Sequence, residues 1–388
     1  MKTFVKLLKN EFRRIFKNDV VMAIFFGAPL VYGLLFGYVY QKAKVTNIPI
    51  LVVDEDQSPL SDKIIEALND NETLQIAQVF FDKNGVKNKM IKNAYAAVIE
   101  IPKDFERNIL QKRYPEVNVE LDMSNILIAN FASKNIQKVL QTLKAGMEIE
   151  SLKKQGMPAK QARESFETFK TTYHKLYNPN SNYEYFMLPG LLGAIMQQVI
   201  FLAMALVFAR DFEDGYLNQL LKVSKNPLYL ILLKASPFIL FSIINWAVLG
   251  AFLAWFKVDL NLYNLPMLIL ISLLTGAAML IGMLFSILIP NQLKATEFLM
   301  VISTPAFILS GFTWPVMAMP HWVQIISGWI PLTPFLSASK KIAFYGGSLQ
   351  HIKPEINQLL LISLISFTLL VISLKLKITQ QLRKKMEK

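Results

Sequence analysis

Six stretches of the chain are apolar and almost free of charge, and segments rich in charged residues separate them. They are 16 to 29 residues long, and about 20 apolar residues cross a hydrocarbon core of about 30 Å as a helix. We therefore predict six transmembrane helices, TM1 to TM6. Their ranges are 20–40, 186–209, 228–256, 265–289, 298–313 and 356–374.

Residues 41–183, between the first and second apolar stretches, have the charge of a soluble domain. Short apolar or alternating runs predict strands at 48–54, 74–81, 94–101 and 117–123. Helical patterns lie between them at 58–68, at 85–92 and from Pro102 onward. Strands that alternate with helices favour a mixed sheet packed against helices, so we predict an α/β domain.

A helical arm is predicted at the end of this domain, over about 125–177. Gly156-Met157-Pro158 interrupts the pattern, so we expect a helical hairpin or a kink there. Two apolar stripes follow the arm and either cover the sheet or contact a second copy or another protein. The stripes are Ile136, Leu140, Leu143 and Met147, and Ala162, Phe166, Phe169, Tyr173 and Leu176.

The first 19 residues combine apolar positions at helical spacing with Lys and Arg on the other side. This pattern predicts an amphipathic helix that lies in the membrane interface. The alternative is a basic flank that only orients TM1.

The distribution of Lys and Arg predicts the topology. With six spans, sixteen of these residues lie on the side of the two termini, including the basic tail 375–388, and four in the short segments opposite. By the positive-inside rule both termini are cytoplasmic and the 41–183 domain is extracytoplasmic. The fold class is thus a polytopic α-helical membrane protein with an inserted extracytoplasmic α/β domain and helical arm.

The segment 210–227, which we call the coupling segment, is a short charged stretch between TM2 and TM3. Buried unsatisfied charges and backbone groups are costly in lipid, so the segment must lie in water. The topology places it in the cytoplasm, beside the amphipathic N-terminal helix. There it offers a surface on which a second protein can act.

The segment 314–345, the outer segment, has four prolines within 315–334 but no acidic residue. Prolines preclude a straight spanning helix, and the apolar composition argues against a solvated loop. We predict two short re-entrant helices in the outer leaflet, with tryptophans at the interface. They form either an anchoring aromatic belt or a gate over a pathway between two copies.

Few polar side chains lie within the predicted spans. Lys234 is near one end of TM3, from which its ammonium can extend to the interface, and we expect no buried charge of the kind that marks an ion path. The remaining polar residues either join helices or line a substrate path. They are Gln197, Gln198, Asn245, Ser303 and Thr304.

Composition excludes several kinds of site. The chain has no cysteine and three scattered histidines, so we expect no metal site. No phosphate-binding loop of the G-x-x-x-x-G-K-[ST] type is present, so the chain cannot bind ATP in that way. Much of the net charge of +13 lies beside membrane spans at the two ends, where topology explains it without nucleic acid.

Two classes of function are open at this stage, an anchored enzyme and a sensor or assembly protein. The 41–183 domain could be an anchored enzyme, but it has one histidine and no G-x-S-x-G motif. Its acidic run Asp54–Asp56 would suit a metal, although such runs more often form a solvated turn. A sensor or assembly protein is the other class, and five spans after the domain exceed what a sensor needs.

Four stretches carry a family resemblance. They are KNEFRRIFKNDVVMAIFFGAPLVYGLLFG (9–37), VVDEDQSPLSDKIIEAL with AAVIEIPKDFERNI (52–68 and 96–109), ARDFEDGYLNQLLKVSKNPLYLILLKASPF (209–238), and SGFTWP…MPHWVQIIS…IPLTPF (310–335). In this order they resemble the membrane subunits of ABC-2 type ATP-binding-cassette exporters with a large ectodomain after the first span. One departure is Tyr216, where that family often has Thr.

The resemblance implies a permease that needs no cofactor of its own, because a separate dimeric ATPase on the cytoplasmic side binds ATP. It also implies a second permease, identical or related, and a bacterial plasma (inner) membrane. Drug-like, lipidic or other amphipathic substrates and a periplasmic adaptor are compatible with it. The expected coupling residues are Arg13, Arg14, Arg210, Asp211, Glu213, Asp214, Gly215, Leu220, Leu221 and Pro227, and the expected outer-gate residues are Gly311, Trp314, Pro315, Pro320, Trp322 and Pro331.

Overall fold

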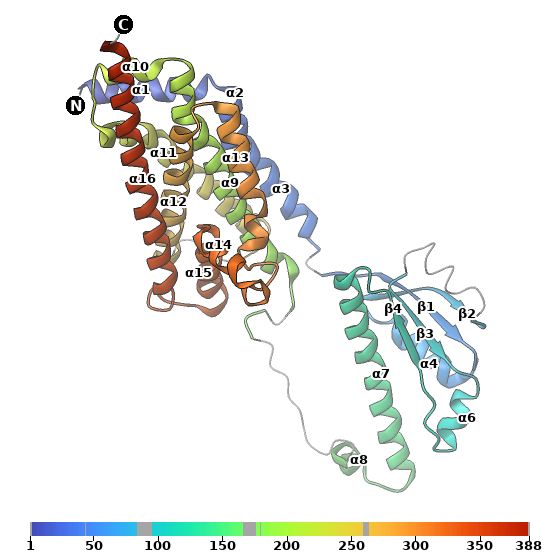
Figure 1. Ribbon diagram of the computed structural model, residues 1–388. Coiled ribbons are helices and arrows are strands. Elements are labelled where there is room, and N and C mark those ends of the chain that lie inside the picture. Colours follow the sequence, from blue (N-terminus) through green and yellow to red (C-terminus); the bar gives the residue numbers. More distant parts are fainter. Residues whose placement is uncertain are drawn as a thin grey trace. The chain divides into compact units, whose positions relative to one another are not determined.

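The computed structural model describes residues 2–42, 44–83, 95–165, 176–178, 180–258 and 264–386. The chain divides into two compact units, Met1–Ala43 with Lys175–Lys388, and Lys44–His174. Helices build the first unit over its described residues, and the second contains a small sheet (Figure 1). The structure therefore confirms a mostly helical chain with an inserted sheet domain.

The helical unit begins with α1 and a first long helix in three parts, α2, a π-helical turn η1 and α3. The long helices α9, α11, α12, α13 and α16 follow, with short helices between them. The bounds are α1 Lys2–Phe16, α2 Asp19–Met22, η1 Ala23–Gly27, α3 Ala28–Tyr40, α9 Tyr183–Glu213, α10 Tyr216–Leu221, α11 Pro227–Trp255, α12 Leu265–Leu288, α13 Gln292–Leu309, η2 Val316–Ala318, α14 His321–Trp329, α15 Leu332–Tyr345 and α16 Lys353–Met386.

Five helices in the described part of the chain are long and apolar enough to cross a membrane. They are Asp19–Tyr40, Tyr183–Glu213, Pro227–Trp255, Leu265–Leu288 and Lys353–Arg383. The predicted TM5 corresponds to α13, which has 18 residues but carries Lys294 and Glu297 in its first two turns. These charges shorten its apolar part, so a total of six spans stays a prediction.

Both chain ends lie at the same end of the helical unit, together with α10, whereas α14 and α15 lie at the opposite end (Figure 1). The basic tail predicted at 375–388 continues the last long helix, because α16 has 34 residues and ends at Met386. At 1.5 Å per residue it is about 50 Å long, which is more than the thickness of a hydrocarbon core.

Helix α9 forms the centre of the helical unit. The apolar window of α9 is 72% buried, compared with 28% to 44% for the other four apolar helices. Its contact with α12 is close because Gly282 faces Met204, and a Cβ atom at Gly282 would lie 2.4 Å from the Met204 Cβ. On the same two helices, the Ser286 hydroxyl donates to Ala205 O at 2.6 Å.

A buried amide joins the first long helix to α11. Pro29 has no backbone N–H, so the carbonyl of Phe25, four residues earlier, lacks its α-helical donor. The Asn245 side chain donates to this carbonyl at 2.6 Å. A substrate-path candidate is thus engaged in joining two helices, at the point where the first helix has its π-helical turn.

The sheet domain has four strands in the order β2-β1-β3-β4. The central strand β1 is parallel to β2 and β3, and β4 is antiparallel to β3. Helices α4, α6 and α7 contribute to the core on one face of the sheet, around Ile50 and Val52. The bounds are β1 Ile48–Asp54, α4 Pro59–Asn69, β2 Leu74–Phe80, β3 Ala97–Ile101, α6 Phe105–Leu110, β4 Asn118–Leu121, α7 Ile126–Lys154 and α8 Ala159–Ser165.

The helical arm consists of α7 followed by α8, with Gly156 at a positive φ of 91° between them. The first apolar stripe packs on the sheet, since Ile136 is buried and Leu140 and Leu143 lie against the same core. The predicted helix 85–92 and most of the second stripe, Phe166, Phe169 and Tyr173, lie outside the described residues.

The acidic run after β1 is used for internal hydrogen bonds. Asp54 Oδ1 accepts from the backbone N–H groups of Asp56 and Gln57, and Asp54 Oδ2 accepts from the Ser61 hydroxyl. Asp56 accepts from the first two amides of α6, at 2.8 and 3.0 Å. The carboxylates therefore stabilise a turn and a helix start, as structural residues do.

The contact of α9 with α12 can be tested at two glycines of α12. We expect Gly282→Ala to lower the free energy of unfolding by about 1–3 kcal/mol, because the new methyl group overlaps Met204. Gly276→Ala is the matched control, since a Cβ atom there meets nothing within 4 Å. Thermal unfolding of the purified protein in detergent measures both, and equal melting temperatures would contradict this packing.

Candidate functional site

Six charged side chains meet where α1 contacts the ends of α9 and α11, and we call them the ionic cluster. Arg14 lies 2.6 Å from Asp211 and 3.2 Å from Asp214. The Lys234 ammonium lies 2.8 Å from Glu11 and 2.5 Å from Asp211. The members are Glu11, Arg14, Arg210, Asp211, Asp214 and Lys234, with Arg210 paired to Asp214 at 3.3 Å.

Three acidic and three basic groups balance the charge of the ionic cluster. The centre of the cluster is buried, because Lys234 is 2% exposed, Asp211 1% and Glu11 6%. Removing a charge from water costs several kcal/mol, so a buried ion pair of this kind adds little net stability. Separating the two partners leaves an uncompensated buried charge, so the cluster fixes the position of α1 against α9 and α11.

The sequence positions these charges through helix periodicity. Glu11 and Arg14 are three residues apart on α1 and therefore share a face. Asp211 lies in the last turn of α9, and Lys234 lies two turns inside α11. Aromatic contacts hold α1 on α11 beside the charges, with Phe4 against Tyr229 and Phe12 against Phe241.

The environment of the Lys234 side chain differs from the prediction. We expected that its ammonium could extend to the interface, and we expected no buried charge of the kind that marks an ion path. The structure instead buries Lys234 between Glu11 and Asp211. The reason is that α1 lies over this part of α11 and brings a carboxylate to Lys234, so the ammonium is paired without leaving the protein.

Tyr216, which departs from the family pattern, packs on the ionic cluster. The guanidinium carbon of Arg14 lies 3.8 Å from the centre of the Tyr216 ring, a cation–π arrangement. Burial lowers the pKa of Arg14, but the charge of Asp211 and the hydrogen bond to it outweigh this and raise the pKa above its ordinary value. Burial, together with the charge of Glu11, raises the pKa of Tyr216. Arg14 therefore stays charged and Tyr216 neutral near pH 7.

The coupling segment is folded rather than extended. Gly215 has φ of 67° and turns the chain from α9 into α10, a conformation that glycine adopts easily. Leu217, Leu220 and Leu221 are buried in the helical core. Two of the predicted coupling residues, Leu220 and Leu221, thus hold α10 in place instead of facing solvent. The exposed residues of this segment are Glu213, Asp214, Asn218, Gln219, Lys222, Val223, Lys225 and Asn226.

Three other predicted coupling residues lie outside the ionic cluster. Glu213 accepts hydrogen bonds from the backbone N–H of Gln292, at 2.9 Å, and from its side-chain amide. This joins the coupling segment to the start of α13. Pro227 is the first residue of α11, after the capping residue Asn226, and Arg13 is exposed on α1.

The polar candidates in the spans differ in what they contact. Ser303 and Thr304 each donate to Met300 O on their own helix. Gln197 is buried in the middle of α9, and no group in the described part of the chain bonds to its Oε1 atom. Gln197 is therefore the candidate with an unused buried acceptor, whereas Gln198 is half-buried.

Prolines divide the outer segment into short elements. Pro315, Pro320 and Pro331 each immediately precede a helix, η2, α14 and α15. Gly311 has φ of 80° and turns the chain after α13. Trp314 is exposed, and α14 presents an exposed apolar face that suits a membrane interface. That face consists of Trp322, Ile325, Ile326 and Trp329.

Comparison with known proteins finds one family and several relatives over most of the chain. A family model described as ABC-2 family transporter protein matches residues 20–372. The probable multidrug ABC transporter permease YbhR of Escherichia coli (strain K12) is 24% identical over 362 residues, which cover 92% of this chain and 94% of the relative. The inner membrane transport permease YhhJ of the same strain is 24% identical over 341 residues, 85% and 87% of the two chains.

A buried charge without its partner should destabilise the site. We expect Lys234→Met to lower the free energy of unfolding by about 3–5 kcal/mol, because Glu11 loses its buried counter-ion. The exposed Lys225→Met serves as the control and should melt like the wild type. Thermal unfolding in detergent is the measurement, and Glu11→Gln with Lys234→Met should recover part of the loss. An unchanged melting temperature for Lys234→Met would show that the pair is not buried in the folded protein.

Proposed function

Since the chain belongs to the ABC-2 family of transporter proteins, we propose that it is the permease subunit of an ATP-driven exporter whose ATP is hydrolysed by a separate ATPase chain. The observation that carries the proposal is the ionic cluster. The cluster holds α1 and the coupling segment against two of the long helices. A force applied to α1 or to the coupling segment is therefore transmitted to the helical unit.

The surface offered to the ATPase is the exposed side of the coupling segment, with α1 beside it. The buried leucines and the cluster hold α10 from inside, which leaves the side with Asn218, Gln219 and Lys222 free for another chain. A rigid handle of this kind is what an ATPase that closes on ATP requires. Arg14 and Asp211 act as positioning residues here because they pair with each other at 2.6 Å and their side chains are only 19% and 1% exposed.

The proposed topology has six spans, with α13 as the fifth. Both chain ends and α10 lie at one end of the helical unit, which an even number of spans requires (Figure 1). The excess of Lys and Arg at that end favours the cytoplasm. The sheet domain then lies outside, and the printed name of the relative YhhJ supports a bacterial inner membrane.

A second permease, identical or related, completes the proposed conduit. The outer segment, together with the turn at Gly311 before it, would close the far side of this conduit, with Pro331 as a second turning point and Trp314 and Trp322 at the membrane interface. Two relatives carry the name multidrug permease, YbhR and YbhS. Together with the apolar spans, these names favour drug-like, lipidic or other amphipathic substrates over ions. Gln197 is the preferred contact within the path, and a periplasmic adaptor is compatible with the sheet domain.

The proposal that a separate chain hydrolyses the ATP gives a first test. Purified alone, this chain should hydrolyse no ATP, because it lacks the phosphate-binding loop. Expressed with the products of its neighbouring genes, it should co-purify with a soluble ATPase, whose activity a phosphate-release assay measures. ATP turnover by the isolated, homogeneous chain would contradict the proposal.

Charge reversal tests the coupling segment. We expect Glu213→Lys with Asp214→Lys to uncouple the ATPase and abolish most of the transport, because it breaks the contacts to Gln292 and Arg14 and makes the surface basic. The matched control is Glu148→Lys with Glu150→Lys, the same change of charge on the exposed side of α7. Transport into inverted vesicles is measured for variants of equal melting temperature. Normal transport by the first variant would remove the coupling role.

A further inference from the structure

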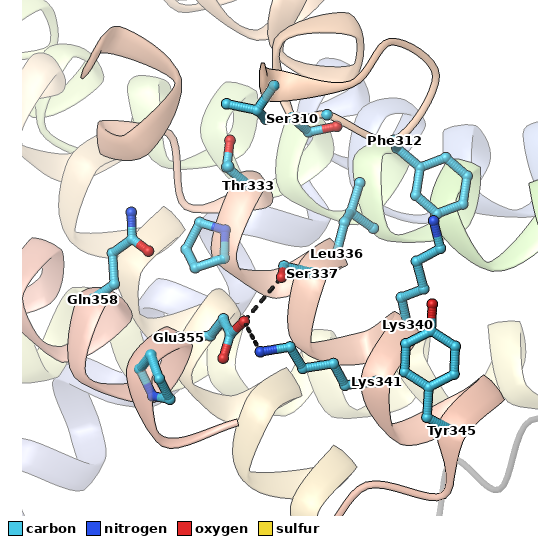
Figure 2. Close-up of a pocket in the computed structure, with 14 residues that line it drawn as sticks. Ser310, Phe312, Thr333, Leu336, Ser337, Lys340, Lys341, Tyr345, Glu355 and Gln358 are labelled. Carbon is cyan, nitrogen blue, oxygen red and sulfur yellow. Dashed lines mark hydrogen bonds and ion pairs between the residues drawn. The ribbon is translucent and has the colours of Figure 1, made fainter. Parts of the chain in front are cut away.

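A cavity of about 430 Å³ lies between α15, the start of α16 and the chain after α13 (Figure 2). Its volume is in the range of small-ligand sites. Polar and charged side chains gather on α15 and α16, and apolar side chains come from the 311–316 turn and from Leu336. The polar set is Thr333, Ser337, Lys340, Lys341, Tyr345, Glu355 and Gln358.

One carboxylate oxygen in this cavity has no partner. Glu355 is 8% exposed, and its Oε1 atom accepts from the Ser337 hydroxyl at 2.9 Å and pairs with Lys341 at 2.6 Å. Its Oε2 atom is buried, and no group within the described residues donates to it. A buried charged oxygen left without a donor is costly, so the site favours a ligand that supplies one.

A cation in the same cavity is also available. Lys340 and Lys341 are neighbours on α15, yet Figure 2 shows Lys341 directed to Glu355 and Lys340 directed toward Phe312. The Lys340 ammonium lies 5.5 Å from the ring centre of Phe186, and no acidic group in the described part of the chain pairs with it. The cavity thus offers a free positive charge and a free carboxylate oxygen on two sides.

An apolar border completes the site. Phe312, Val316 and Leu336 line the cavity. On the turn that carries Val316, Trp314 is 56% exposed and Met317 is 88% exposed. Exposed apolar side chains beside a polar pocket provide a place for an acyl chain next to a bound headgroup.

We propose that this cavity binds the headgroup of a membrane phospholipid with a terminal hydrogen-bond donor, ethanolamine or glycerol. The phosphate pairs with Lys340, the terminal ammonium or hydroxyl donates to Glu355 Oε2, and the acyl chains leave past Trp314 and Met317. Choline headgroups fit less well because a quaternary ammonium cannot donate a hydrogen bond. The inference rests on the proposed function only in placing this end of the helical unit at a membrane surface.

Native mass spectrometry of the full chain in detergent tests the site. Phosphatidylethanolamine, phosphatidylglycerol and phosphatidylcholine with identical acyl chains are titrated separately. We expect the first two to bind roughly tenfold more tightly than the third, the effect of one hydrogen bond to a charged group. Lys340→Gln should weaken the binding of the ethanolamine and glycerol lipids by a similar factor. Lys353→Gln, an exposed lysine of α16 outside the cavity, should change nothing.

Glu355→Gln separates the two contacts. It should reduce the preference for ethanolamine over choline lipids while leaving the phosphate contact to Lys340. If this variant does not fold, the Lys340→Gln titration decides alone. Equal binding of all three lipids to the wild type, or wild-type binding by Lys340→Gln, would overturn the proposal. Lipid binding needs neither ATPase nor transport, so this outcome is distinguishable from failure of the proposed function.

Discussion

The helical unit depends on one constraint at the end that carries both chain ends: a lysine inside an apolar helix must have a counter-ion. Lys234 satisfies it with Glu11 and Asp211, which come from two other helices. Because a buried charge tolerates little movement of its partners, the three helices have one mutual position. The amphipathic α1 is thus a fixed part of the helical unit, and its apolar side is covered by aromatic residues of α11.

This constraint explains how a short charged segment becomes a defined surface. The hydrogen bonds of Glu213 to Gln292 join α9 to α13, and buried leucines place α10 against the core. Most positions expected to take part in coupling therefore shape the segment from inside, through the ionic cluster and the buried leucines. The residues exposed on the outer side of α10 are others, Asn218, Gln219 and Lys222.

The sequence predicted the elements better than their contacts. Apolar length located the long apolar helices, and short apolar or alternating runs located the strands, because these patterns are local. The ionic cluster is not local, because Lys234 and Glu11 are 223 residues apart in the sequence. The residues that flank each of them do not indicate that the two are in contact. A usable signal existed, since Lys234 is the only charge within its span and Glu11 is the only acid in a basic helix. Treating both as unpaired charges in need of a partner would have linked them. The orphan oxygen of Glu355 had no such signal, because burial and hydrogen-bond partners depend on the folded chain.

The length of α16 has a mechanical consequence. A single helix runs from the first turn that holds Glu355 to Met386, near the chain end. A continuous helix of about 50 Å acts as a lever: a tilt of about 5° at one end displaces the other by about 4 Å. No proline lies in it after Pro354 to absorb such a tilt. Small rearrangements around the cavity and at the opposite end of the helical unit are therefore geometrically linked through this helix.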